Sequence, residues 1–280
     1  MLGIRRIQSS TMRALMPIML VLLAMLSGSV QSFNYTVRTN FPLTDFSQNQ
    51  VSYGNATALL MQLQRHRVSQ DGEEFRLYND YFCGAENGTF LEMGALDGIL
   101  LSNTYALEQG LNWGGVLIEA NPVSYRALAR NRPSAITIRS AVCATDNIVT
   151  FCQSSPQISG IWEFMSEGFK QQWYPNGLPA STIQLPCVPL SRLLHLARIT
   201  HYNFFSLDVE GAELQVLKSI NWQLVSFEVI VVEASNKEGD SAKTEQVREL
   251  LMHHGYKFDK HVHRNDWFIH SSFIPTKCDL

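Results

Sequence analysis

The stretch that decides the fold is residues 89–98, which read TFLEMGALDG. Its first five residues are mostly apolar and predict a short buried β-strand over 89–93. Gly94 and Gly98 then allow the backbone to turn tightly and to approach a ligand closely. The spacing is E-x-G-x-x-x-G and not G-x-G-x-x-G, which disfavours a nicotinamide cofactor. The open alternative is an ordinary glycine-rich turn, since such turns follow many strands.

The same pattern of strand and helix continues along the chain after this turn. Strands alternating with helices predict a parallel sheet with right-handed crossovers, and nearly continuous apolar strands predict cover on both faces. We therefore expect an α/β fold, Rossmann-like, with an open and mostly parallel sheet of about seven strands. Further strands are expected at 115–120, 135–142, 202–208 and 227–233, helices at 103–109, 123–130, 191–197, 212–220 and 243–254, and a final antiparallel pair at 256–261 and 267–270.

Composition restricts the classes of protein. The chain has 280 residues, 45% of them apolar, which suffices for one sizeable domain with its own core. Lys and Arg total 22 against 25 Asp and Glu, a net charge of −3, so we expect no nucleic-acid partner. Five cysteines are too few for a disulfide scaffold in a chain of this length.

Residues 1–30 predict a targeting segment. Arg5, Arg6 and Arg13 precede the apolar run 14–26, and small residues follow it, as in a secretory signal peptide. The alternative is an uncleaved signal-anchor through 14–30, although a bilayer span needs about 20 apolar residues. Both interpretations deliver the remaining chain to the lumen of the endoplasmic reticulum and Golgi, either membrane-anchored or secreted.

Three glycosylation sequons begin at Asn34, Asn55 and Asn87 and agree with that compartment. Each sequon alone is weak, because such triplets also occur by chance.

The cysteines can form disulfides in an oxidising lumen. Cys143 and Cys152 flank an expected hairpin at 144–151 and are the best candidate pair, with two buried thiols as the alternative. Because the number of cysteines is odd, that pairing leaves at least one of Cys83, Cys187 and Cys278 free or bonded to another chain.

Carboxylates follow two of the expected strands. Glu119 ends the second strand, where a carboxylate can accept hydrogen bonds from both hydroxyls of a ribose. The alternative is a surface acid before a helix that starts at Asn121. Asp208 and Glu210 follow the fourth strand and could bind a metal, orient a cationic group or act as a base. Glu213 falls in the first turn of the next helix, where capping is an alternative role.

The segments outside this pattern complete the domain organisation. Residues 31–86 are interpreted as a lead-in and 87–280 as the main domain, with an irregular insertion at 153–189. The insertion carries aromatic side chains that could form a lid or acceptor pocket, or a small satellite core: Trp162, Phe164, Trp173 and Tyr174.

Four motifs together resemble the FkbM-type methyltransferases, in the branch of eukaryotic secretory-pathway proteins similar to Star. They are residues 90–98, 102–104, 117–122 and 205–213, which read FLEMGALDG, SNT, LIEANP and FSLDVEGAE. The resemblance covers about residues 87–270 and implies a class I methyltransferase fold with S-adenosyl-L-methionine as cofactor. It implies that the turn at 92–98 holds the methionine part of the cofactor and Glu119 the ribose.

The residues of these motifs also lead to a hypothesis for the reaction. Asp208 and Glu210 are the expected catalytic residues, and no metal ligand is assigned. The expected reaction is O-methylation of a hydroxyl on a glycan or small molecule. A non-catalytic trafficking protein on the same fold and another nucleotide-using enzyme remain alternatives, and the oligomeric state is open. The expected cofactor-binding residues are Glu92, Gly94, Ala95, Asp97, Gly98, Asn103, Glu119 and Asn121.

Overall fold

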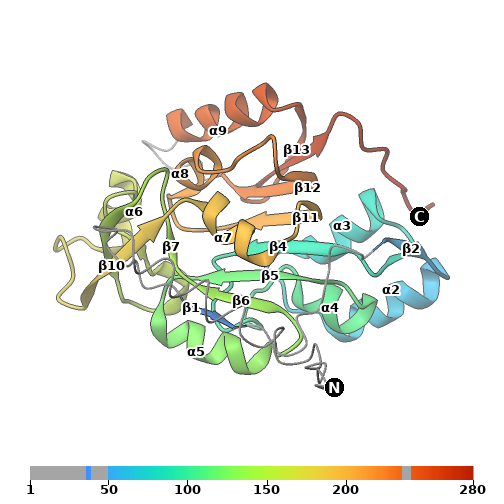
Figure 1. Ribbon diagram of the computed structural model, residues 1–280, viewed down its shortest axis with the longest axis horizontal. Coiled ribbons are helices and arrows are strands. Elements are labelled where there is room, and N and C mark those ends of the chain that lie inside the picture. The colour runs from blue at the N-terminus through green and yellow to red at the C-terminus, as the bar shows by residue number, and fades with distance from the viewer. Residues whose placement is uncertain (1–35, 39–49, 235–240, 280) are drawn as a thin grey trace, which may run out of the picture. The chain divides into compact units, whose positions relative to one another are not determined.

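A computed structural model describes residues 36–38, 50–234 and 241–279. Eight of its strands form one central sheet in the order β1-β6-β5-β4-β11-β12-β14-β13 (Figure 1). These strands are β1 (Thr36–Arg38), β4 (Thr89–Met93), β5 (Gly114–Glu119), β6 (Ile136–Arg139), β11 (His201–Leu207), β12 (Ser226–Glu233), β13 (Tyr256–Val262) and β14 (Asn265–His270).

The pairing confirms the predicted open, mostly parallel α/β sheet. Strands β6, β5, β4, β11 and β12 are parallel neighbours, while β1, β14 and β13 pair antiparallel at the two edges. Chain order reverses between β4 and β11, because the chain proceeds from β4 through β5 to β6 on one side and from β11 to β12 on the other. Ligands bind at such a reversal in open α/β sheets, beyond the carboxyl ends of the strands.

Helices cover the sheet, and side chains on both of its faces are buried. Leu63 and Leu107 from helices pack into one buried cluster with Phe90 of β4 and Phe204 of β11. Their strand neighbours Leu91 and Phe205 point to the opposite face and are buried as well. The helices are α2 (Ala56–Arg65), α3 (Glu73–Tyr81), α4 (Tyr105–Leu111), α5 (Pro122–Asn131), α6 (Glu167–Trp173), α7 (Leu190–Ala197), α8 (Glu213–Lys218) and α9 (Ser241–His253).

Part of the expected lead-in packs into the same core. Leu77 and Tyr78 of α3 belong to the cluster that contains Phe90, and a small sheet joins β2 (Ser52–Tyr53) to β3 (Ala85–Glu86). The boundary at residue 86 stays a prediction. The expected signal segment, residues 1–30, lies outside the described residues. Among the helices that the structure describes, none is both long and apolar enough to cross a bilayer.

The segment 153–189 differs from the irregular insertion that we expected. It contains η2 (Pro156–Ile158), β9 (Gly160–Ile161), α6 and β10 (Thr182–Val188). Strand β10 pairs with β7 (Ala141–Val142) and β8 (Asn147–Cys152), so the order of this second sheet is β7-β10-β8-β9. The prolines misled the prediction because most of them start elements or lie between them. The second sheet also changes one expected strand. Residues 135–142 form two strands, β6 and β7, which are separated at Ser140 and belong to different sheets.

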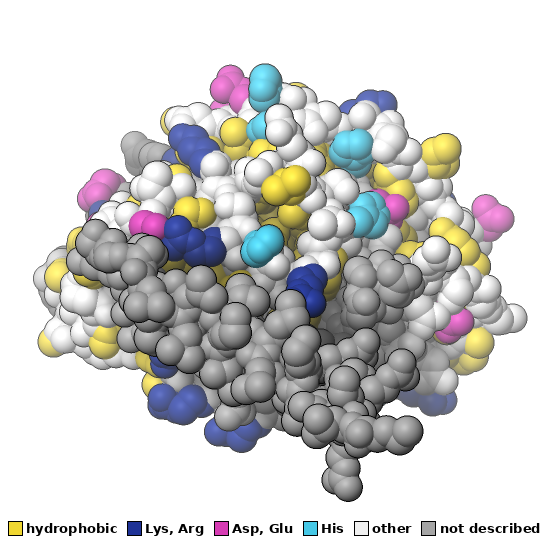
Figure 2. Space-filling view, in the orientation of Figure 1, with side chains coloured by type: hydrophobic (Ala, Val, Ile, Leu, Met, Phe, Trp, Pro, Cys, Tyr) yellow, Lys and Arg dark blue, Asp and Glu magenta, His cyan; other side chains and the backbone are white. Residues whose placement is uncertain are grey.

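Charged side chains on the face drawn in Figure 2 are interspersed, with Lys and Arg lying among Asp and Glu. This distribution agrees with the small net charge of −3.

The predicted Cys143–Cys152 bridge is wrong. The disulfides are Cys143–Cys187 and Cys83–Cys278, and Cys152 is a buried free thiol. The register gives the reason: Cys187 of β10 lies opposite Ala141 of β7, two residues from Cys143, whereas Cys152 lies at the far end of β8, opposite Thr182. The expectation that Cys83, Cys187 or Cys278 is unpaired fails with it.

Thiol counting tests this pairing. We expect one reactive thiol per chain under denaturing, non-reducing conditions, on Cys152, and slow labelling in the native state because burial raises its pKa to about 11. Replacing Cys143 by serine should release Cys187 and add a second thiol. A Cys143–Cys152 peptide in a non-reducing digest would contradict the pairing.

Candidate active site

A cavity of about 340 Å³ opens at the carboxyl ends of β4, β5, β11 and β12. Elements of the 153–189 segment, α6 and β10, gather at one end of the central strands, while α2 and the C-terminus lie toward the other end (Figure 1). Predicted site residues from several strands line this one cavity: Glu92, Gly94, Asn103, Glu119, Asp208 and Glu210.

Gly94 makes the closest backbone contact at this edge. Its φ is +79°, and a Cβ atom there would lie 1.8 Å from the carbonyl oxygen of Asp208. Any side chain at this position would therefore clash with the backbone of the neighbouring strand end. A glycine is required for β4 and β11 to end side by side.

Glu92 organises the loop that follows β4. Its carboxylate accepts hydrogen bonds from Ser102 Oγ at 2.8 Å, Thr104 Oγ1 at 2.5 Å and the backbone N–H of Asn103 at 2.8 Å. Burial raises the pKa of Glu92, and these donors together with Arg132 oppose that shift. Asn103 is held from a second side, because its Nδ2 donates to Ser206 Oγ at 2.9 Å.

Glu119, at the end of β5, is bonded to the same loop. Its carboxylate accepts the backbone N–H groups of Leu96 at 2.9 Å and Asn121 at 2.6 Å. Burial raises the pKa of Glu119 to about 7. Each carboxylate oxygen has two lone pairs, so both can still accept a ribose hydroxyl. Glu119 is thus placed for the predicted role, which no contact in the structure tests.

Four of the expected cofactor-binding residues do not line the cavity. Ala95 is buried, and Asp97 Oδ1 accepts the backbone N–H groups of Ile99 and Leu100. Gly98 lies against Arg132, and Asn121 caps α5 through Val123 N–H. These four residues shape the turn and the start of α5, and their contact with the cofactor remains a prediction.

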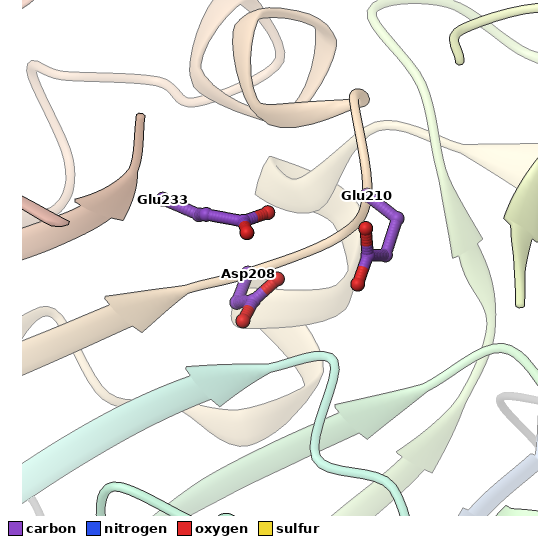
Figure 3. Close-up of side chains that lie close together, drawn as sticks. All are labelled: Asp208, Glu210 and Glu233. Carbon is purple, nitrogen blue, oxygen red and sulfur yellow. The ribbon is translucent and has the colours of Figure 1, made fainter. Parts of the chain in front are cut away.

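Three carboxylates meet at the ends of β11 and β12 (Figure 3). One oxygen each from Asp208, Glu210 and Glu233 lies within 4.8 Å of the others. Burial raises the pKa of Asp208, and burial together with the charge of Asp208 raises that of Glu233 well above its usual range. Both shifts favour the protonated form of these two neighbouring carboxyl groups. Oxygen ligands in this arrangement are also those that a hard divalent cation prefers.

Glu233 is the residue that sequence reasoning missed, although a usable signal was present. It ends a strand that is parallel to β11, and Leu207 pairs with Val232, so Asp208 and Glu233 follow in the same register. The sequence placed both acids at strand ends but did not show which strands are neighbours. Glu213 behaves as a local cap: it accepts the N–H groups of Val209 and Gly211, and burial raises its pKa to about 7.

Residues outside the predicted site form the outer wall of the cavity. Gln70 precedes α3 and Glu73 begins it, while Arg264 lies in the turn after β13 and Asn265 begins β14. Asn265 Nδ2 donates to Glu73 Oε1 at 2.8 Å, which joins the two segments. Of the four insertion aromatics, Trp173 lines the cavity, whereas Trp162 and Tyr174 pack edge to face and Phe164 packs beside a small core cluster.

Residues 83–258 match the family described as the methyltransferase FkbM domain, which is more than half of the chain. The chain belongs to this family, which confirms the predicted FkbM resemblance, while the branch similar to Star stays a prediction. It is therefore a methyltransferase that uses S-adenosyl-L-methionine. The cavity fits this cofactor: Glu119 is available for the ribose, and Ile118 and Val142 offer apolar surface for the adenine.

Solved methyltransferase structures are similar at low identity. Fibrillarin from Aeropyrum pernix with bound S-adenosyl-L-methionine is 14% identical over 66% of each chain, with a TM-score of 0.36. An O-methyltransferase from Bacillus cereus in complex with SAH is 14% identical over 77% of this chain and 90% of that chain, with a TM-score of 0.38. These scores are low, so the assignment rests on the family match and the strand-end geometry. No curated protein matches the sequence.

The pH dependence of cofactor binding tests Glu119. A carboxylate accepts both ribose hydroxyls better than a carboxyl group, so affinity should rise as the pH increases through about 7. We expect the Kd for S-adenosylhomocysteine, measured by titration calorimetry, to fall about tenfold between about pH 6 and about pH 8. Glu119→Gln should bind more weakly and lose this dependence. A wild-type profile that is retained in Glu119→Gln would contradict the role.

Proposed function

We propose that this protein O-methylates a hydroxyl of a glycan or small molecule in the secretory pathway. The observation that carries the proposal is the Asp208–Glu233 pair at the cavity wall, where the two carboxyl groups come within 4.8 Å of each other and desolvation raises the pKa of both. The cofactor would supply a methyl group activated by a sulfonium, which an acceptor oxygen can attack in line with the departing thioether sulfur.

The acid pair supplies the base for this reaction. In this proposal Glu233 is the protonated partner and Asp208 the carboxylate, because burial and the charge of Asp208 raise the pKa of Glu233 well above its usual range. Asp208 accepts the proton of the acceptor hydroxyl as the oxygen–methyl bond forms and the methyl–sulfur bond breaks, and the electron pair stays on sulfur. Because burial raises the pKa of Asp208, its carboxylate is a stronger base than one in water.

The surroundings of the pair suit a hydroxyl-bearing acceptor. Carboxylate oxygens of Glu210 and amide groups of Gln70 and Gln157 can bond hydroxyls, and the partly exposed ring of Trp173 offers a flat apolar surface. The wall is built from segments distant in the sequence, so it can hold an acceptor from several sides.

Features outside the cavity support the compartment. Two disulfides join distant segments, as expected for a chain that folds in an oxidising lumen. The basic and apolar leader and the sequons agree with this placement, as does the resemblance to secretory-pathway members similar to Star.

Methyl transfer to an oxygen can be tested with cofactor that carries a deuterated methyl group. We expect labelled product from a panel of sugars, glycans and small alcohols, as an ether that survives mild base. Asp208→Asn should lower kcat by roughly 10² to 10⁴, because the general base is lost. Its Kd for S-adenosylhomocysteine should stay within about twofold of wild type, since catalysis and not cofactor binding is impaired.

Asp146→Asn is the matched control, because Asp146 pairs with Arg192 on the surface, away from the cavity. Label in a base-labile ester or on nitrogen, or full activity of Asp208→Asn, would contradict the proposal.

Glycosylation tests the compartment. Asn55 is exposed and uses only its Oδ1 to cap α2, so its Nδ2 can carry a glycan. At Asn87, Nδ2 donates to Ser52 and the sequon's Thr89 is buried. In a secreting eukaryotic cell we expect Asn55→Gln to remove a glycosidase-sensitive mass shift and Asn87→Gln to leave that shift unchanged. A full-length chain without any glycan would count against luminal delivery.

A further inference from the structure

Arg132 follows α5 and lies outside the cavity, yet its guanidinium is buried beneath the loop after β4. Its side chain is 0% exposed and lies between the rings of Phe90 and Tyr105, at 5.5 and 5.6 Å. Arginine is almost never fully buried unless its charge is paired. Its partners therefore indicate what the buried charge does.

Every hydrogen bond that the guanidinium makes within the described residues goes to residues 98–108. Nη1 donates to Gly98 O at 2.9 Å and to Ser102 Oγ at 3.3 Å, and Nη2 donates to Thr104 Oγ1 at 3.2 Å. Nε donates to Glu108 Oε2 at 2.8 Å, which supplies the countercharge. A planar group with five fixed donors can hold several points of one loop at once, as a lysine ammonium cannot.

The same hydroxyl groups connect Arg132 to the cavity. Ser102 Oγ and Thr104 Oγ1 accept from Arg132 and donate to the carboxylate of Glu92. Their direction of donation is thereby fixed, from guanidinium to hydroxyl to carboxylate. Asn103 lies between these hydroxyls, and its side chain lines the cavity together with Leu101.

The position of Arg132 explains why residue 98 is a glycine. Its φ is +83°, and a Cβ atom there would lie 2.6 Å from Arg132 Cγ. Gly98 does not line the cavity, so the second glycine of the turn makes room for Arg132. Asn131 also restrains this segment, because its Nδ2 donates a hydrogen bond to Asp97 O at 2.8 Å.

We propose that Arg132 is a positioning residue for the cofactor: it sets the shape of residues 98–104 and the orientation of Glu92 without touching the cofactor itself. A guanidinium that served only the apolar core would not need three polar partners on the loop after β4 and a fourth, Glu108, on α4. The inference rests on the cofactor and is independent of the acceptor and the compartment.

The test measures the Kd for S-adenosylhomocysteine by titration calorimetry, at a temperature where circular dichroism shows each variant folded. We expect Arg132→Met to bind at least about tenfold more weakly and Arg132→Lys to recover part of that loss. Arg192→Met is the control and should bind within about twofold of wild type, because Arg192 pairs with Asp146 on the surface.

A double-mutant cycle separates positioning from general destabilisation. If Arg132 acts through Glu92, the change Arg132→Met should add little to the loss already caused by Glu92→Gln. Additive losses, or wild-type affinity in Arg132→Met, would overturn the proposal. If Arg132→Met does not fold, Ser102→Ala and Arg132→Lys decide, and wild-type affinity in both overturns it. Wild-type protein that fails to bind S-adenosylhomocysteine would overturn the cofactor assignment as well.

Discussion

The backbone contact between Gly94 and Asp208 is the constraint on which the site depends. The carbonyl oxygen of Asp208 occupies the place that a Cβ of Gly94 would need, and Asp208 N–H donates to Met93 O at 3.2 Å. Two strands from distant parts of the chain therefore end side by side where the order of the sheet reverses. The loop after β4 and the acids after β11 share one cavity because of this contact.

Register and burial then determine the chemistry. Parallel pairing of β11 with β12 places Glu233 beside Asp208, and desolvation raises the pKa of both carboxyl groups. Glu92, two residues before Gly94, is buried. Its carboxylate accepts hydrogen bonds from Ser102, Thr104 and Asn103. Similar carboxyl groups thus have different surroundings: Asp208 and Glu233 face each other, whereas Glu92 is bonded to the donors of one loop.

The sequence predicted what depends on local pattern. The strand 89–93 coincides with β4, and the acids and glycines at strand ends were identifiable because apolar runs and turn residues mark where strands stop. What it could not predict depends on which segments are neighbours. Glu233, the outer wall at Gln70 and Arg264, and the pairing of Cys143 with Cys187 all follow from strand order and register. Arg132 was missed because the sequence around it does not show that the loop after β4 packs against its side chain.

The arrangement of the cysteines has a consequence for biogenesis. Cys143 and Cys152 are far closer along the chain than Cys143 and Cys187, which are 44 residues apart, and short loops close at a lower entropic cost. In the oxidising lumen that we propose for this chain, the shorter loop would favour the non-native crosslink before β10 has emerged. Reaching the native connectivity then requires a thiolate exchange, with Cys187 as the attacking sulfur and Cys152 as the leaving one. Maturation of this enzyme should consequently depend on an isomerase.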